Sequence, residues 1–407
     1  MKLLAYIFLY LFVAETIIDC NTVYSLRIPK AIWNVVKLAS IAALLPAVFP
    51  FIKRNQVSNK RCLIWGVCYV LLAIMMFLLM KADFYSNFIY HFVLFLPLFV
   101  LYFSFAEEKY KMVFFKIFSE EMAVVGLLSL VLWYLGPLTH TIYPTGLTYI
   151  PWGEGFFIDH YYGLQFETQY MVMFGHEILR NSGFFAEAPM FNFCLCSALF
   201  CEVFLVPQKR LLVMGILLVT IFTTFTTMGM LVLGGIFVVF AVQKIAKSKN
   251  MIVLFLGYLS MPFLIGGLLL MSLLLMKDKS DSRSYAGRSG GIQYGISMFL
   301  KSPIWGNGYC KSMQGVGSNS IFLLLADGGI LLCSFYYIPL FYFPLKNRKR
   351  NKPEFYFSLF YVFLFSLTMI AYSNISLVFV AYFYAGYLKK KKNIGYEHGP
   401  NEQNLLR

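Results

Sequence analysis

The chain has 407 residues, of which 59% are hydrophobic, 19% are aromatic and only 13% are charged. A soluble domain carries about 25% charged residues, so this chain lacks the polar side chains needed to cover a surface that faces water. The composition excludes an ordinary soluble protein. The formal net charge of +15 indicates a membrane topology signal and attraction to anionic lipid rather than nucleic-acid binding.

Long apolar runs predict that the chain crosses a membrane many times. A spanning helix needs about 20 mostly apolar residues, because the hydrocarbon core of a bilayer is about 30 Å thick. We therefore expect an all-α integral membrane protein with about twelve transmembrane helices. In chain order the runs lie at 3–19, 31–52, 62–80, 86–105, 121–138, 185–206, 210–226, 228–245, 251–276, 319–345, 354–371 and 373–388.

Two of these assignments depend on where a long apolar stretch is divided. The stretch 210–245 is too long for one span and is divided at the threonine-rich segment Thr223–Thr227. The stretch 354–388 is divided at Tyr372–Asn374. A single tilted helix at either place would change the number of spans.

Basic residues predict the orientation of these spans. Cytoplasmic loops of membrane proteins carry an excess of Lys and Arg. Such residues collect in every second connection of this chain, at 53–61, 109–116, 209–210, 244–249, 346–352 and 389–392. Both termini are therefore expected in the cytoplasm, with two long polar loops outside.

The expected organisation alternates helical blocks with these two loops. Its parts are spans 1 to 5 in residues 1–138, a first outer loop at 139–184, spans 6 to 9 in 185–276, a second outer loop at 277–318, spans 10 to 12 in 319–388 and a basic cytoplasmic tail at 389–407. Long loops in a compact protein are usually functional, so a site is expected on the outer face.

Few ionisable side chains fall inside the predicted spans. Lys37 and His91 are the notable ones, and we expect Lys37 to pair or to extend toward the membrane surface. A transporter would place more such groups at mid-membrane. Cys20 and Cys310 are both predicted outside, which leaves a disulfide between them open.

The first outer loop combines aromatic and polar side chains. Trp152 lies among many Tyr and Phe residues, and Asp159 and His160 are interleaved with them. Aromatic faces beside hydrogen-bonding groups suit sugars, which makes these three residues candidates for substrate binding. An interfacial aromatic belt is the alternative.

The end of this loop carries a candidate anion site. Arg180 precedes the predicted sixth helix, which begins near Glu187 with Pro189 in its first turn. A helix N-terminus with an arginine beside it can bind an anion. A structural pair between Arg180 and Glu187 is the alternative.

The second outer loop carries Arg283 and Arg288 among small residues. Guanidinium groups match phosphate oxygens and stay charged at any working pH, so two such arginines could hold a diphosphate. A solvated basic loop is the alternative. The next helix is expected to begin near Ser318 and Asn319.

At these residues the sequence resembles the O-antigen polymerase and ligase superfamily, the Wzy-type membrane glycosyltransferases. The resemblance rests on three blocks, whose order matches the expected topology. They are Arg180-x-x-Gly183-x-Phe185-x-Glu187-x-Pro189, then Gly287-Arg288 with Tyr294-Gly295 and the run 303–308 (Pro-Ile-Trp-Gly-Asn-Gly), then the run 318–330 (Ser-Asn-Ser-Ile-Phe-Leu-Leu-Leu-Ala-Asp-Gly-Gly-Ile).

Two departures from the family pattern are visible. Ala188 separates the glutamate and the proline of the first block, and Ser318 stands where the ligases have a histidine. A histidine-dependent ligase mechanism therefore does not carry over, which favours a polymerase over a ligase.

The resemblance implies a GT-C-like fold and a glycosyltransferase that needs no metal or cofactor. Its donor would be a glycan on undecaprenyl diphosphate, and its acceptor a lipid-linked repeat unit at the outer face of the bacterial cytoplasmic membrane. Flippase and chain-length regulator proteins are the implied protein partners, beside the lipid bilayer. A ligase-type transferase and a lipid-linked oligosaccharide flippase or transporter remain the alternatives.

With this chemistry in mind, Arg180 and Arg288 are the predicted diphosphate clamps, Arg283 is a third contact, and Glu187 orients Arg180 or the acceptor. Ser318 and Asn319 are expected to donate hydrogen bonds at the start of the next helix. The general base is left open between Asp159, His160 and Glu187.

Overall fold

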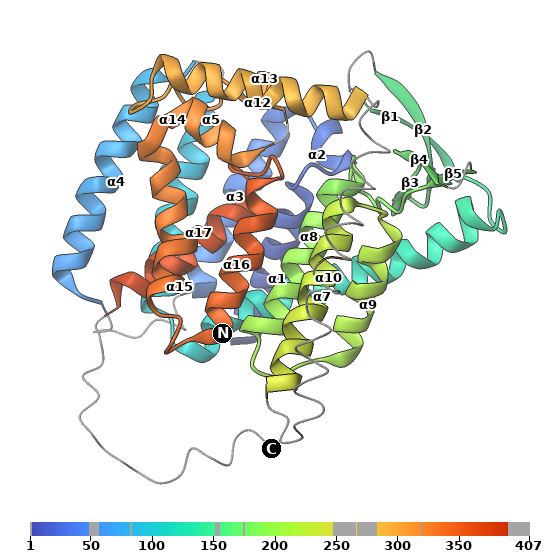
Figure 1. The fold of residues 1–407 in the computed structure, drawn as a ribbon, viewed down its shortest axis with the longest axis horizontal. Helices are drawn as coiled ribbons and strands as arrows, with labels where there is room; N and C mark the ends of the chain where they lie inside the picture. The colour runs from blue at the N-terminus through green and yellow to red at the C-terminus, as the bar shows by residue number, and fades with distance from the viewer. Residues whose placement is uncertain are drawn as a thin grey trace, which may run out of the picture.

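The computed structural model describes residues 2–48, 57–81, 84–150, 155–173, 176–246, 266, 283–317 and 319–389. This part of the chain is mostly helical, with two small sheets at one end of a helix bundle (Figure 1). Five of the described helices are long and apolar enough to cross a membrane, at Asn59–Leu79, Tyr85–Phe105, Tyr110–Leu138, Ala188–Leu205 and Ser320–Lys346. Shorter apolar helices add to them, so the prediction of a helical membrane protein is confirmed.

Most of the helices follow the predicted apolar runs. The helices Val23–Arg27, Arg283–Lys301 and Met313–Val316 lie outside those runs, and another helix begins at Glu108, in the basic segment expected as a connection. In chain order the helices are α1 (Lys2–Ile18), α2 (Val23–Arg27), α3 (Lys30–Val48), α4 (Asn59–Leu79), α5 (Tyr85–Phe88), η3 (Ile89–Phe95), α6 (Leu96–Phe105), α7 (Glu108–Trp133), η4 (Tyr134–Leu138), α8 (Ala188–Phe200), η5 (Cys201–Leu205), α9 (Leu211–Thr223), α10 (Thr227–Ala246), α12 (Arg283–Lys301), α13 (Met313–Val316), α14 (Ser320–Tyr337), η6 (Ile338–Tyr342), α15 (Phe343–Lys346), α16 (Lys352–Ser366) and α17 (Asn374–Leu388). The helices end at both expected divisions, between α9 and α10 and between α16 and α17. The predicted run 251–276 lies, apart from residue 266, outside the described ranges, as does the tail after Lys389.

Connections gather at two opposite ends of the bundle. At the upper end of Figure 1, α12 lies across the helices, and the amide of Val23 donates to the carbonyl of Phe184 at 3.0 Å. At the other end, Val57 forms an isolated β-bridge with Lys389, and the Arg61 guanidinium donates to the Lys389 carbonyl at 2.9 Å. These two sets of contacts join segments that the basic-residue pattern assigns to opposite sides of a membrane, and they lie at opposite ends of the bundle.

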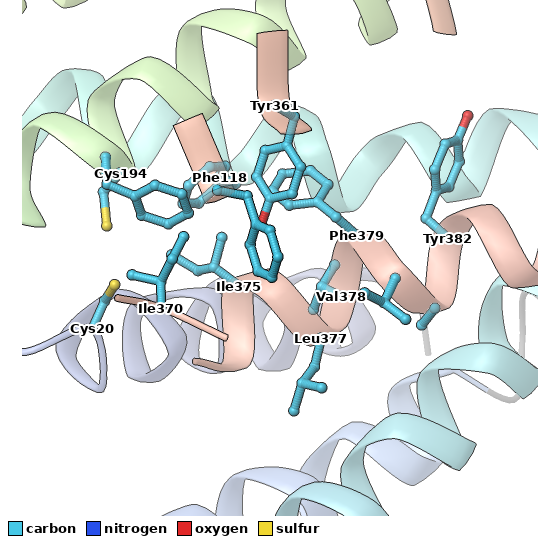
Figure 2. Close-up of a cluster of buried hydrophobic side chains, with 14 of the residues drawn as sticks. Cys20, Phe118, Cys194, Tyr361, Ile370, Ile375, Leu377, Val378, Phe379 and Tyr382 are labelled. Atoms are coloured by element: carbon cyan, nitrogen blue, oxygen red, sulfur yellow. The ribbon is translucent and has the colours of Figure 1, made fainter. Parts of the chain in front are cut away.

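The core of the bundle is built from apolar and aromatic side chains around α17. Figure 2 shows Tyr361 of α16 packed on Phe379 of α17, with ring centroids 4.5 Å apart. Cys20 and Cys194 face each other beside them. All eight cysteines are free, so the disulfide between Cys20 and Cys310 that the sequence left open is not formed.

The first outer loop folds into short strands, which the sequence did not predict. One sheet has the order β1 (Gly146–Ile150), β2 (Phe156–Tyr161), β3 (Gln165–Phe166), and a separate hairpin joins β4 (Tyr170–Met173) to β5 (His176–Leu179), all antiparallel. The turn from β2 to β3 places Tyr162 and Gly163 at φ 51° and 70°. These are the central residues of a tight turn that the Leu164 amide closes by donating to the Tyr161 carbonyl at 3.0 Å.

Candidate functional site

The first sequence block gathers around the side chain of Gln169. The Arg180 guanidinium donates from Nη1 to Gln169 Oε1 at 3.1 Å and from Nε to the carbonyl of Thr224 at 3.0 Å. The same Gln169 oxygen accepts the amide of Ala188, the first residue of α8, at 3.3 Å. A half-buried guanidinium and the N-terminus of α8 therefore meet at one side-chain oxygen, which accepts a hydrogen bond from each of them.

The turn between α9 and α10 is the platform for this block. The Asn181 amide donates to the Thr223 carbonyl at 3.1 Å, and its side-chain Nδ2 donates to Thr223 Oγ1 at 3.0 Å. Gly183 follows at φ 54°, with the Phe191 ring 3.3 Å from the position of a Cβ atom. The threonine-rich segment thus has a structural role beyond ending a helix. The sequence did not predict that Gln169 and this turn belong to the site, because only the tertiary structure brings them to Arg180.

Glu187 lies at the start of α8. It is the N-cap residue, with φ −140° and ψ 139°, and its carbonyl accepts the amides of Met190 and Phe191. Pro189 stands in the first turn, as predicted. Arg180 and Glu187 therefore flank the same helix entrance.

Asp159 and His160 lie on β2, not on an irregular loop. The His160 Nδ1 accepts the Gly163 amide at 3.3 Å and lies 3.3 Å from Thr145 Oγ1, while its ring packs on Phe166 at 5.4 Å. These contacts give His160 a role in holding the hairpin. Neighbouring residues on a strand point to opposite faces, so the strand separates the two predicted site residues.

A carboxylate that the sequence did not single out joins this sheet to the β4–β5 hairpin. Glu167 accepts the hydroxyl of Tyr161 at 2.8 Å and that of Tyr170 at 2.6 Å. Burial, followed by the hydrogen bond to Glu167 and its charge, raises the pKa of both phenols. Asp159 adds negative charge nearby. The Tyr161 and Tyr170 phenols and the Glu167 and Asp159 side chains thus lie close together, with Tyr161 buried and Tyr170 exposed.

The second block is helical where a polar loop was expected. Arg283 and Arg288 both belong to the N-terminal half of α12, and only their backbone is described. Their approach to Arg180 therefore stays a prediction. Trp152 and Ser318 lie outside the ranges that the structure describes.

The second and third blocks pack against each other. The Gly308 amide donates to the Asp327 carbonyl at 2.7 Å, and the Asn307 side chain donates to the Ala326 carbonyl at 2.7 Å. Gly306 and Gly329 have φ angles of 72° and 58°, and a Cβ atom on either would lie within 2.5 Å of backbone atoms of the other block. Glycine is required at both positions, so this part of the motif is structural.

The start of α14 is buried against the connection between α16 and α17. Asn319 is the N-cap residue of α14, buried, and its carbonyl accepts the amide of Leu323 at 3.1 Å. Further along, Asp327 is fully buried and accepts the Ser312 amide at 2.8 Å and the Tyr372 hydroxyl at 2.9 Å. Asp327 thus ties the outer segment after α12 to the bundle, a role that the sequence alone did not reveal.

Among the described residues, no group of three or more His, Cys, Asp or Glu side chains could hold a metal ion. The chemistry on this face is that of guanidinium groups, a helix N-terminus, carboxylates and phenols. Comparison of the chain with family models, with curated proteins and with solved structures finds no match in any of the three.

Proposed function

We propose that this chain is a Wzy-type polysaccharide polymerase, a metal-independent membrane glycosyltransferase with a GT-C-like fold. It transfers a growing glycan from undecaprenyl diphosphate onto a lipid-linked repeat unit at the outer face of the bacterial cytoplasmic membrane. The upper end of the bundle in Figure 1 is then the outer face, and both termini are cytoplasmic. The observation that carries the proposal is the meeting of Arg180 and the α8 N-terminus at Gln169.

The leaving group of this reaction is a lipid diphosphate, so the enzyme must bind negative charge at the membrane surface. Arg180 and the amides of the first α8 turn supply positive charge there. Arg288, with Arg283 as a weaker contact, approaches the diphosphate from α12 at the same end of the bundle. Such preorganised charges stabilise the departing diphosphate more than the intact donor.

The acceptor glycan lies on the strands of the first outer loop. The aromatic rings there offer faces for sugar C–H groups, and the carboxylates offer partners for hydroxyls. Two of the three candidate bases, Asp159 and Glu187, have carboxyl side chains, and both stay candidates for the general base. His160 has its Nδ1 engaged with the β2–β3 turn.

A second candidate function is a lipid-linked oligosaccharide flippase or transporter. The observation that favours it is a group of buried ionisable residues inside the bundle, Glu15, Asp19, Lys37 and His91. The sequence showed Lys37 and His91 as exceptions within apolar runs, but it did not show that they lie close to Glu15 and Asp19. Intramembrane charges of this kind often mark a transport path.

Reconstitution separates these functions. Purified protein in liposomes receives an undecaprenyl-diphosphate-linked repeat unit on the outer-face side, and the products are separated by size. A polymerase yields a ladder of glycan lengths. A ligase instead yields no ladder and adds finished polymer to another acceptor, while a flippase moves labelled substrate across the bilayer without lengthening it; either result contradicts the proposal.

A further inference from the structure

A cluster of buried polar side chains lies between four helices inside the bundle. Helix α1 contacts α3, and η3 contacts both α3 and α17. The cluster consists of Glu15 on α1, Asp19 just after α1, Lys37 on α3, Tyr90 and His91 on η3, and Asn374 at the start of α17. None of these residues belongs to the outer surface considered for glycan transfer.

The positive charge of the cluster is already neutralised. Lys37 is 6% exposed, and its Nζ lies 2.5 Å from Asp19 Oδ1. Asp19 Oδ1 also accepts the indole N–H of Trp33 at 2.8 Å. Lys37 and Asp19 therefore form a closed pair, which leaves any charge on a further carboxylate without a matching cation.

Glu15 is that further carboxylate. It is 5% exposed, and neither of its carboxylate oxygens accepts a hydrogen bond among the described residues. The nearby Ser40 hydroxyl donates instead to the Lys37 carbonyl at 2.8 Å. In an apolar interior without hydrogen bonds, an ionised carboxylate costs far more free energy than the neutral acid.

Two more polar atoms of the cluster lack partners in the described part of the chain. They are Nε2 of His91 and Oδ1 of Asn374. The second polar atom of each of these two side chains has a partner. His91 Nδ1 lies 2.8 Å from the Tyr309 hydroxyl, and Asn374 Nδ2 donates to the Tyr90 hydroxyl at 3.0 Å. The residues on η3 are carried by a π-helical turn, a distortion that is frequent at functional sites.

We propose that Glu15 is a proton-binding site in the interior of the helix bundle, where it holds its proton as a neutral carboxylic acid at neutral pH. The ionisable groups that face it are Asp19 on the same segment, Lys37 from α3 and Tyr90 from η3. The ligand is a proton, and no other co-reactant is needed. Through its contact with Tyr309, His91 connects this cluster to the segment that follows α12.

Infrared spectroscopy tests this site without reference to the enzymatic activity. Protein carrying a carbon isotope label at the glutamate side-chain carboxyl is reconstituted in lipid bilayers, and spectra with and without Glu15→Gln are compared at neutral pH. Glutamine keeps the size of the neutral acid but lacks its carbonyl band. The comparison is made in a Glu121→Gln background, because Glu121 also has a buried oxygen without a hydrogen bond among the described residues and would add an acid band of its own.

The expected result is an isotope-shifted carboxylic acid band in Glu121→Gln that is lost when Glu15→Gln is added to it in the double variant. Retention of the full band in the double variant overturns the proposal. The proposal also fails if the double variant loses only a band of the ionised carboxylate. If that carboxylate band shifts when sodium is added to Glu121→Gln, the site binds a metal cation in place of the proton. If the double variant does not fold, Glu121→Gln still decides, since absence of an acid band in that variant also overturns the site.

Discussion

Lys37 Nζ lies 2.5 Å from Asp19 Oδ1, although the two residues belong to different helical segments and are both almost completely buried. The sequence predicted that a lysine inside an apolar run would pair or extend to the surface, and it pairs. The partner follows the end of α1, which makes this ion pair a link between the first two long helices.

Removal of one partner of this pair should destabilise the protein strongly. Lys37→Met or Asp19→Asn leaves a buried group without its counterpart, and such changes cost about 3–5 kcal/mol. The double variant should lose less than the sum of the two. Thermal unfolding in detergent measures all three, with Lys301→Met at an exposed position as a neutral control. Additive losses would show that the two side chains do not interact.

Arg180 is expected to be essential for polymer formation. Arg180→Ala should lower ladder formation by about 10²-fold or more, because a preorganised charge at the leaving group is lost. Gln169→Ala keeps the guanidinium and removes one of its acceptors, so its loss should be smaller. Size-exclusion profiles check that both variants remain folded in detergent. An unchanged ladder from Arg180→Ala would remove Arg180 from the proposed mechanism.

The glycine of the second block that approaches α14 should tolerate no side chain. In Gly306→Ala, the new Cβ would lie 2.3 Å from the Gly328 amide nitrogen, at a φ of 72° that itself costs about 1–2 kcal/mol for an L-residue. Reduced expression and a lower melting temperature are expected. Gly386→Ala on α17 is the matched control, because nothing lies within 4 Å of its Cβ position. Equal stability of the two variants would contradict this packing.

Asp327 should hold the outer segment after α12 in place. Asp327→Asn turns one acceptor into a donor that faces the Ser312 amide or the Tyr372 hydroxyl, a loss of about 1–3 kcal/mol. Tryptic cleavage after the exposed Lys311 measures release of the segment and should become faster in the variant. Tyr372→Phe removes one hydrogen bond only and should show a smaller increase. Cleavage at the wild-type rate in both variants would exclude this role.

The strands of the first outer loop should loosen at alkaline pH. The raised pKa values of Tyr161 and Tyr170 mean that their hydrogen bonds to Glu167 stabilise the loop fully below the ordinary phenol pKa of about 10, and that this contribution is lost as the pH rises above it. Cleavage within 155–173 by an alkali-stable protease should accelerate in that range. The double variant with phenylalanine at both positions should be cleaved faster than wild type near neutral pH and lose most of the pH dependence. Tyr143→Phe, at an exposed position, should behave as wild type.

The first outer loop shows where sequence reasoning failed. Its aromatic and acidic residues were recognised, but the strands that organise them were not, because short strands with exposed aromatic residues lack a clear alternating pattern. The glycine in the turn at Tyr162 and Gly163 was a local signal for a hairpin. Similarly, the small residues around Arg288 indicated a loop, whereas the structure continues α12 through them, so packing outweighed weak helix propensity.

The sequence by itself determined the membrane character, the position of most helices and the division of the long apolar stretches at Thr223–Thr227 and Tyr372–Asn374. These features are local, because the length of an apolar run decides whether it can span a bilayer. Only the tertiary structure decided that Gln169 joins Arg180 to α8, that Asp327 holds the segment after α12, and that Glu15 is buried beside a closed Lys37–Asp19 pair. Each of these depends on contacts between residues far apart in the chain, and a contact of that kind leaves no periodicity for a single sequence to display.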